Sequence, residues 1–370
     1  MRFWTRLLLV SLLLSLGGSA LAAPRYYIVD IGSVWAEAVN EDGDVAGYFR
    51  YAGAGSAYHA FSILDGVLVD HGTLGGAYSY GRGINDLGET VGESQTSDFT
   101  RGFVVIDGVM TELGVLLEML GSYSQASAIN NSGQIAGFST AHMNGYAHAF
   151  VTIDGVMTDL GTLGGNSSYA YGINEFGEVT GWSKLPDGSN RAFATVGGVM
   201  TDLGTLAGDT DSGAKAINDL GQVVGQSYIW IPHPYIGSVK YGTAFLTVDA
   251  VMTDLGALPG AETSEAHAVN NQGQVVGTSE NTAFYYDDEV GMVELASLVI
   301  DMGDWTELQF ARDINEQGVV IGYTGGRSFK LIPATAHPVP VLGNVGLLML
   351  ASILMCIAPL WLRFRVTRRS

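Results

Sequence analysis

The chain has little of what several protein classes need. Its 370 residues include one cysteine, Cys356, which excludes a disulfide framework and a cysteine-based metal site. Charged residues make up only 15 % and hydrophobic residues 47 %, so an intrinsically disordered chain is excluded, because such chains are poor in apolar residues. Cations are scarcer than anions: 17 Lys and Arg stand against 37 Asp and Glu, and the net charge of −20 argues against a nucleic-acid partner.

The short motifs of common catalytic sites are missing too. The sequence has no Gly-x-Ser-x-Gly nucleophile elbow, no His-Glu-x-x-His metal site and no phosphate-binding loop. Asp301 and Asp304 are acidic neighbours, but nothing in the sequence pairs them as an acid and a base. We therefore predict no cofactor and no metal.

Glycine, in contrast, is abundant, at 51 residues or about twice its usual share, and it belongs to an internal repeat. After the second Gly of each repeat comes a small residue followed by Phe, as in His59-Ala60-Phe61, and then a Val-Met-Thr-Asp-Leu-Gly element, as in residues 156–161. The pattern Asn-x-x-Gly-x-x-x-Gly occurs seven times, starting at Asn40, Asn85, Asn130, Asn174, Asn218, Asn270 and Asn315.

Each repeat predicts four short antiparallel strands. In the third repeat these are residues 125–129, 134–139, 149–153 and 156–160, separated by Asn- and Asp-Gly turns that supply the positive φ of tight hairpins. The Asn-x-x-Gly segment is turn chemistry on this interpretation, because it lacks the alternating Asp and Asn ligands of a calcium loop. Four such strands are typical of one blade of a β-propeller.

The two ends of the repeat array indicate that the ring closes. No Val-Met-Thr-Asp-Leu-Gly element follows Phe329 in the last repeat, and a lone copy of that element stands at residues 27–32. We therefore predict an all-β, seven-bladed β-propeller over residues 24–335, whose first strand completes the last blade and leaves no open sheet edge. A twisted solenoid is the alternative.

Residues 1–23 predict a secretory signal peptide, with basic Arg2 and Arg6, apolar residues 7–16 and small residues before the cleavage position. At the other end, residues 343–362 carry no charge and are long enough to span the inner membrane, at least transiently. Arginines at positions 363, 365, 368 and 369 follow and would stay in the cytoplasm. The body between the ends, with 11 Lys and Arg against 37 Asp and Glu, has a net charge of −26 and would lie outside that membrane.

The segment 336–370 resembles the bacterial exosortase-type sorting signals of the PEP-CTERM class. It has a short proline motif, Pro338-Val339-Pro340-Val341, without the usual Glu, then the apolar stretch and the arginine-rich tail. The resemblance implies cleavage by an exosortase-type enzyme and release to the cell surface or the extracellular space. A permanent membrane anchor is the other interpretation.

The repeat itself resembles the bacterial HAF family of probable extracellular repeats. The resemblance rests on the His-Ala-Phe signature at His59-Ala60-Phe61 and His148-Ala149-Phe150, and on the Asp-Leu-Gly-Thr-Leu-Gly-Gly segment 159–165, and it covers residues 26–332. It implies an exported repeat protein and assigns no catalytic residue.

The strand that runs into each Asn is expected to be innermost, because its alternate positions hold Ala or Gly, which suit a crowded centre. The position three before the Asn is different, since it is mostly polar and varies between repeats. We expect these seven side chains to face a central channel, either as a ligand site or as ion pairs that fill the channel. They are Glu37, Arg82, Ser127, Tyr171, Lys215, His267 and Arg312.

Aromatic residues mark one mouth of the predicted channel. Five positions before the Asn stand Trp35, Tyr80, Tyr169 and Phe310, and the long fifth repeat adds Tyr228, Trp230 and Tyr235 to a loop on the same face. Aromatic rings around a concave mouth offer flat apolar surfaces to sugars or peptides. The alternative is that they only pack the blades together.

These observations predict an exported, monomeric, non-catalytic binding or scaffold protein at the bacterial cell surface, with a glycan or a surface protein as ligand. An extracellular polysaccharide-active hydrolase or lyase is one alternative. A purely structural matrix protein is the other.

Overall fold

The computed structural model describes residues 23–51, 57–233, 237–249 and 251–334. The predicted signal peptide, up to residue 22, and the C-terminal segment 336–370 lie outside the described residues. Within the described ranges, no helix is both long enough and apolar enough to cross a membrane.

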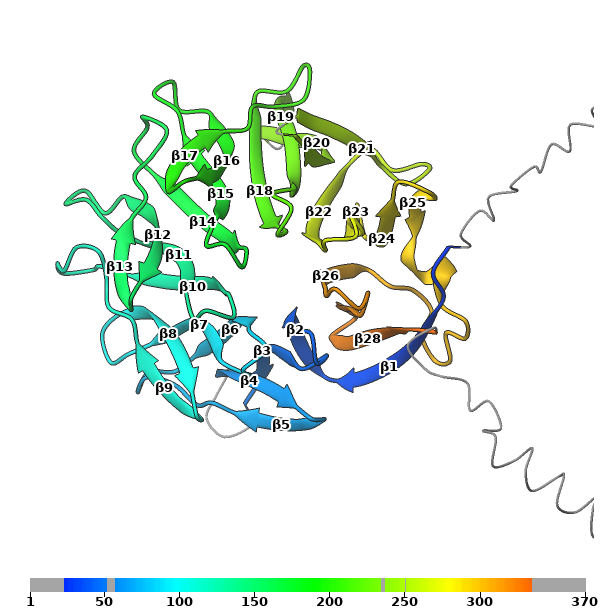
Figure 1. Cartoon of the computed structure of the whole chain (residues 1–370), viewed down its shortest axis with the longest axis horizontal. Coiled ribbons are helices and arrows are strands. Elements are labelled where there is room, and N and C mark those ends of the chain that lie inside the picture. Colours follow the sequence, from blue (N-terminus) through cyan, green and yellow to red (C-terminus); the bar gives the residue numbers. More distant parts are fainter. Residues whose placement is uncertain (1–22, 52–56, 234–236, 250, 335–370) are drawn as a thin grey trace, which may run out of the picture.

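Seven antiparallel sheets of four strands each surround a central opening, which confirms the seven-bladed propeller and excludes the solenoid (Figure 1). Blades 1 to 4 consist of β2 (Val34–Val39), β3 (Val45–Arg50), β4 (Tyr58–Leu64) and β5 (Val67–Asp70); β6 (Ser79–Ile84), β7 (Thr90–Gln95), β8 (Thr100–Ile106) and β9 (Val109–Glu112); β10 (Ser124–Ile129), β11 (Ile135–Thr140), β12 (Ala147–Ile153) and β13 (Val156–Asp159); and β14 (Ser168–Ile173), β15 (Val179–Lys184), β16 (Asn190–Val196) and β17 (Val199–Asp202).

The remaining blades are built in the same way, with one exchange in the last. They consist of β18 (Asp211–Ile217), β19 (Val223–His233), β20 (Gly237–Val248) and β21 (Val251–Gly256); β22 (Ser264–Val269), β23 (Val275–Ser279), β24 (Thr282–Asp287) and β25 (Gly291–Glu294); and β26 (Phe310–Ile314), β27 (Val320–Thr324), β28 (Arg327–Pro333) and β1 (Tyr26–Gly32). A single 3₁₀ turn, η1 (Leu295–Leu298), follows β25. The strand leading into each repeat Asn is innermost and the Val-Met-Thr-Asp element outermost, as predicted.

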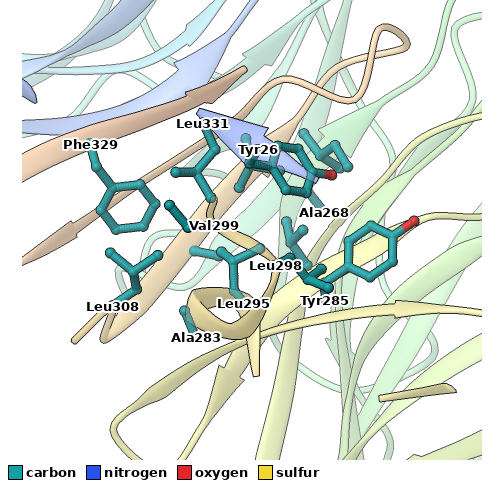
Figure 2. Close-up of a cluster of buried hydrophobic side chains, with 14 of the residues drawn as sticks. Tyr26, Ala268, Ala283, Tyr285, Leu295, Leu298, Val299, Leu308, Phe329 and Leu331 are labelled. Atoms are coloured by element: carbon teal, nitrogen blue, oxygen red, sulfur yellow. The ribbon is translucent and has the colours of Figure 1, made fainter. Parts of the chain in front are cut away.

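The first strand of the body closes the ring. Strand β1 pairs antiparallel with β28, with Tyr27 opposite Ile332 and Asp30 opposite Phe329, and the two lie side by side in Figure 1. Tyr26, 1 % exposed, packs with Phe329 and Leu331 of β28 in a buried cluster that also takes in η1 (Figure 2). The closing strand is thus held by both backbone pairing and side-chain burial.

The repeat Asn organises its own turn and also joins neighbouring blades. Asn130 Oδ1 accepts the backbone N–H of Ser132 at 3.1 Å and of Gln134 at 2.9 Å, while its Nδ2 donates to the carbonyl of Asn174 in the next blade at 3.1 Å. The same inter-blade bond recurs at all seven Asn residues and returns from Asn315 to Asn40. A closed ring of seven hydrogen bonds therefore encircles one end of the channel.

The Phe signature also has a structural meaning. Its seven phenylalanines, at positions 61, 103, 150, 193, 245, 284 and 329, are all 0 % exposed. Where His precedes, His59 and His148 pair through Nδ1 with Asp70 and Asp159 of the neighbouring outer strand, both at 2.9 Å. The His-Ala-Phe signature thus pairs a blade's third and fourth strands.

Candidate functional site

A channel of about 360 Å³ runs through the centre of the ring, and its wall contains all seven side chains expected there. Each inner strand carries a register irregularity at that position, as between Ala36 and Ala38 around Glu37. A bulge residue has no direct opposite in the partner strand, which frees its side chain to leave the sheet. The surrounding Ala and Gly residues, such as Ala38 and Gly83, keep the channel open.

Charged groups of the wall pair across the seam between the last blade and the first. Arg312 binds Glu37 with two nitrogens, Nε at 3.2 Å and Nη2 at closer range. Arg82 approaches the same carboxylate at 3.8 Å and binds Glu93 at 2.8 Å. Burial opposes the charge on Arg312, yet the Glu37 carboxylate raises its pKa. Two guanidinium groups therefore share Glu37.

A second charged group lies at blades 5 and 6. Lys215 Nζ lies 3.2 Å from Glu265 and 5.1 Å from the ring centre of Tyr171. Burial alone would raise the pKa of Glu265, but Lys215, His267 and Lys240 together hold that pKa at about 2. Glu265 is therefore ionised at any physiological pH.

Two further titratable groups lie between these pairs. His267 Nδ1 donates to the carbonyl of Ala311 at 2.7 Å, and burial, followed by the charge of Arg312, lowers the pKa of His267 to about 4. Asp313 accepts the N–H groups of Val39 and Ile314, but burial still raises its pKa to about 7. At neutral pH the imidazole is uncharged and the carboxyl group is partly so.

Aromatic rings lie where the inner strands begin, next to the channel wall: Arg82 Cζ is 5.8 Å from the ring centre of Tyr48 and 5.4 Å from that of Tyr80. We call this group of rings the aromatic rim. Trp35 stacks on Tyr48 with ring centres 5.3 Å apart. Tyr169 stacks on Trp182 at 4.4 Å, and Phe310 on Tyr323 at 5.0 Å. All six rings are half-buried. The rim consists of Trp35, Tyr48, Tyr80, Phe138, Tyr169, Trp182, Phe310 and Tyr323.

Four of the eight rim residues were not predicted from the sequence. Tyr48, Phe138, Trp182 and Tyr323 each follow the second Gly of a repeat directly, and each is paired with the residue five before the Asn, as Tyr48 is with Trp35. That Gly is required, because a Cβ at Gly47 would lie 1.9 Å from the Trp35 carbonyl oxygen. The residue after the second Gly was the signal that could have revealed these positions.

Blades 5 and 6 interrupt the rim. Five positions before the repeat Asn, these two blades have Gly213 and Glu265 in place of an aromatic residue. Directly after the second Gly they have Gln226 and Thr278. Tyr228 lies beside this gap, where its hydroxyl oxygen accepts a hydrogen bond from Asn190 Nδ2 at 3.0 Å, and Lys240 Nζ lies 4.1 Å from its ring centre. The mouth is therefore aromatic over most of its circumference and charged over the rest.

The predicted loop of the fifth repeat is a long hairpin. Strand β18 pairs with β19 only as far as Tyr228, so the hairpin beyond that residue extends past its blade. Trp230 stands on this extension and is 50 % exposed. Tyr235 lies outside the described residues. The structure thus brings Trp35, Tyr80, Tyr169 and Phe310 to the mouth, whereas Trp230 stands on the projecting hairpin.

The opposite mouth is acidic. The residue after each repeat Asn accepts the N–H of its counterpart in the preceding blade, as Asp86 does from Glu41 at 2.9 Å. Five of the seven are carboxylates and two are asparagines: Glu41, Asp86, Asn131, Glu175, Asp219, Asn271 and Glu316. We call this set the acidic ring. Burial raises the pKa of Glu41, Glu175 and Glu316.

The arrangement can bind a ligand through stacking, hydrogen bonds and charge. Across the described residues, no three His, Cys, Asp or Glu side chains are grouped as a metal site would need. The ion pairs of the wall match the structural interpretation of these residues, and the open channel and the half-buried rim remain accessible to a ligand. Binding by any of these residues stays a prediction.

Three solved structures are distantly similar to this chain. A gluconolactonase from Xanthomonas campestris aligns over 85 % of this chain and 93 % of its own, with 10 % identity and a TM-score of 0.43. Streptogramin B lyase aligns over 84 % and 98 %, with 14 % identity and a TM-score of 0.46. The PQQ-bound aldose sugar dehydrogenase of Streptomyces coelicolor aligns over 84 % and 99 %, with 10 % identity and a TM-score of 0.39. No family model and no curated protein matches the chain. With TM-scores below 0.5, these likenesses carry no argument about the fold or the activity of this chain.

Proposed function

We propose that this protein is a saccharide-binding β-propeller that takes its ligand at the aromatic rim. The observation that carries the proposal is the set of three stacked aromatic pairs at one channel mouth, none of which is fully buried. Buried packing would not need to leave these rings open, and exposed aromatic surface marks binding sites. Flat apolar faces beside polar groups suit a sugar ring, whose own faces are apolar and whose edges carry hydroxyl groups.

Export to the cell surface is part of the same proposal. It rests on the sequence of residues 1–23 and on the resemblance of the repeat to extracellular proteins. The tail would hold the body at the membrane, or an exosortase-type enzyme would release it. The seven-fold repetition supplies a rigid frame on which the rim residues vary.

A glycan array combined with a peptide array, probed with the full-length chain, tests this function. We expect binding to saccharides and its loss in the Tyr169→Ala variant. A Phe176→Ala variant is the matched control, because Phe176 is an exposed aromatic residue of the opposite face. Binding only to peptides, or saccharide binding that the rim variant does not weaken, would contradict the proposal.

A further inference from the structure

The channel concentrates cations in an otherwise acidic molecule. Outside the two ends the chain has 11 Lys and Arg, because six of its 17 are the arginines at positions 2, 6, 363, 365, 368 and 369. Arg82, Lys215 and Arg312 lie in the channel wall, and Lys240 lies at the charged gap of the rim. A body of net charge −26 therefore places four of its few cations around one small volume.

Three nitrogen-bearing side chains occupy consecutive blades. Lys215, His267 and Arg312 come from the bulge positions of blades 5, 6 and 7, and all three line the channel. Their mutual influence is direct, since the charges of Arg312 and Lys215 both lower the pKa of His267. Because Nδ1 of His267 donates to a carbonyl, Nε2 is an acceptor, suited to a hydroxyl group.

The carboxylates of the site pair with three of the four cations and leave Lys240 without an ion pair in the part of the chain that the structure describes. Glu93 binds Arg82, Glu37 is shared by Arg82 and Arg312, and Glu265 lies beside Lys215. Lys240 has no carboxylate within ion-pair distance among the described residues and rests on the Tyr228 ring. Lys215 itself is 39 % exposed at its side chain, so its ammonium group is accessible.

The mouth opposite the aromatic rim carries charges of the other sign. The five carboxylates of the acidic ring stand at the mouth opposite the aromatic rim. Charge in a confined channel steers ions of opposite sign and repels those of the same sign. The acidic ring would therefore repel an anion at its own mouth, so an anion would have to enter from the aromatic rim.

We infer that the saccharide bound at the aromatic rim is an acidic one, whose carboxylate enters the channel between Lys215 and Arg312. This inference rests on the proposed function. The sugar ring would stack at the rim, while a neighbouring hydroxyl group donates to His267 Nε2. A neutral sugar would leave Lys240, which has no carboxylate within ion-pair distance among the described residues, without an anionic partner.

Calorimetric titration of the full-length chain, held in a non-glycosidic detergent, tests the inference. The probes are tetragalacturonate and its fully methyl-esterified form, which has the same sugar chain but carries an uncharged methyl ester in place of each carboxylate. We expect the charged form to bind about tenfold more tightly, with an advantage that shrinks as salt is added. Lys215→Gln should remove most of that advantage, so that the acid and the ester bind with similar affinities.

Two further variants complete the test. Lys240→Gln removes a positive charge but keeps the ion pair between Lys215 and Glu265. The contribution of the charge to binding can therefore be measured with this variant even if Lys215→Gln is unstable. Arg25→Gln removes an exposed charge outside the channel and should change neither affinity. Equal binding of ester and acid, or binding of neutral array glycans but of neither probe, would overturn the acidic preference and leave saccharide binding intact. Failure of every saccharide would overturn the proposed function as well.

Discussion

Asn315 donates from Nδ2 to the backbone carbonyl of Asn40, 2.8 Å away, across the seam where the last blade meets the first. The two residues lie at opposite ends of the repeat array, yet their bond is equivalent to the six that join consecutive blades. Its Oδ1 at the same time accepts the N–H of Val319 at 2.8 Å. One side chain thus shapes its turn and helps to close the ring.

Replacing Asn315 with Ala should destabilise the fold. The change leaves the buried Val319 N–H without its partner and removes one of the two donors to the Asn40 carbonyl, at a cost of about 1–3 kcal/mol. Urea unfolding followed by circular dichroism measures this cost. Asn144→Ala, at an exposed turn, is the control and should change little. Equal effects of the two changes would mean that the Asn ring contributes nothing.

The Asp313 carboxyl group should make stability fall with rising pH. Burial raises its pKa in the folded protein to about 7, above the unfolded value, with Glu41 adding to the rise and Arg312 opposing it. The folded state therefore favours the proton, and this contribution is present at low pH and lost as the pH rises through about 7. Between pH 5 and pH 9, the free energy of unfolding of Asp313→Asn should fall less than that of the natural chain.

Asp107→Asn is the control for this measurement. Asp107 is exposed, sits in a turn at a φ of 51° that Asn also tolerates, and should leave the pH dependence unchanged. If Asp313→Asn and the natural chain show parallel pH profiles, the carboxyl group is ionised in the folded state like any exposed one.

The His-Asp pair of the signature should show the opposite dependence. Burial alone would raise the pKa of Asp159, but the hydrogen bond from His148 lowers it below the unfolded value. The ionised carboxylate therefore stabilises the fold above its unfolded pKa, and this stabilisation is lost as the pH falls. Asp159→Asn should therefore lose less stability than the natural chain between pH 7 and pH 3. The Asp159 side chain is 43 % exposed, which limits the effect to below about 1 kcal/mol. A steeper acid loss in the variant would refute the assignment.

Trp230→Ala should weaken the binding of a saccharide long enough to reach from the aromatic rim to the fifth-repeat hairpin, without lowering the melting temperature. The side chain is 50 % exposed on a hairpin that extends beyond its blade, so little packing is lost. Loss of one stacking surface corresponds to about a fivefold change in affinity. Calorimetry and thermal unfolding of the same samples measure both quantities. A parallel loss of affinity and melting temperature would show that Trp230 is a structural residue.

The number of blades, the order of the strands and the closing strand could be predicted from the sequence, because each follows from a pattern that recurs at nearly constant spacing. Sequence reasoning also placed Glu37 and Arg312 in the channel, since their position was polar in an otherwise uniform repeat. It did not find Tyr48 or Trp182, because their pairing depends on a register that the bulge shifts by one residue. Nor did it pair Arg312 with Glu37, which meet only once the ring has closed.

A crystal structure of the protein soaked with tetragalacturonate tests the central claim most directly. We predict a sugar ring against the aromatic rim, in contact with Tyr169 or Trp35, and a carboxylate within ion-pair distance of Lys215. A sugar bound at the acidic ring or on the outer strands, with the rim occupied only by solvent, would contradict the account.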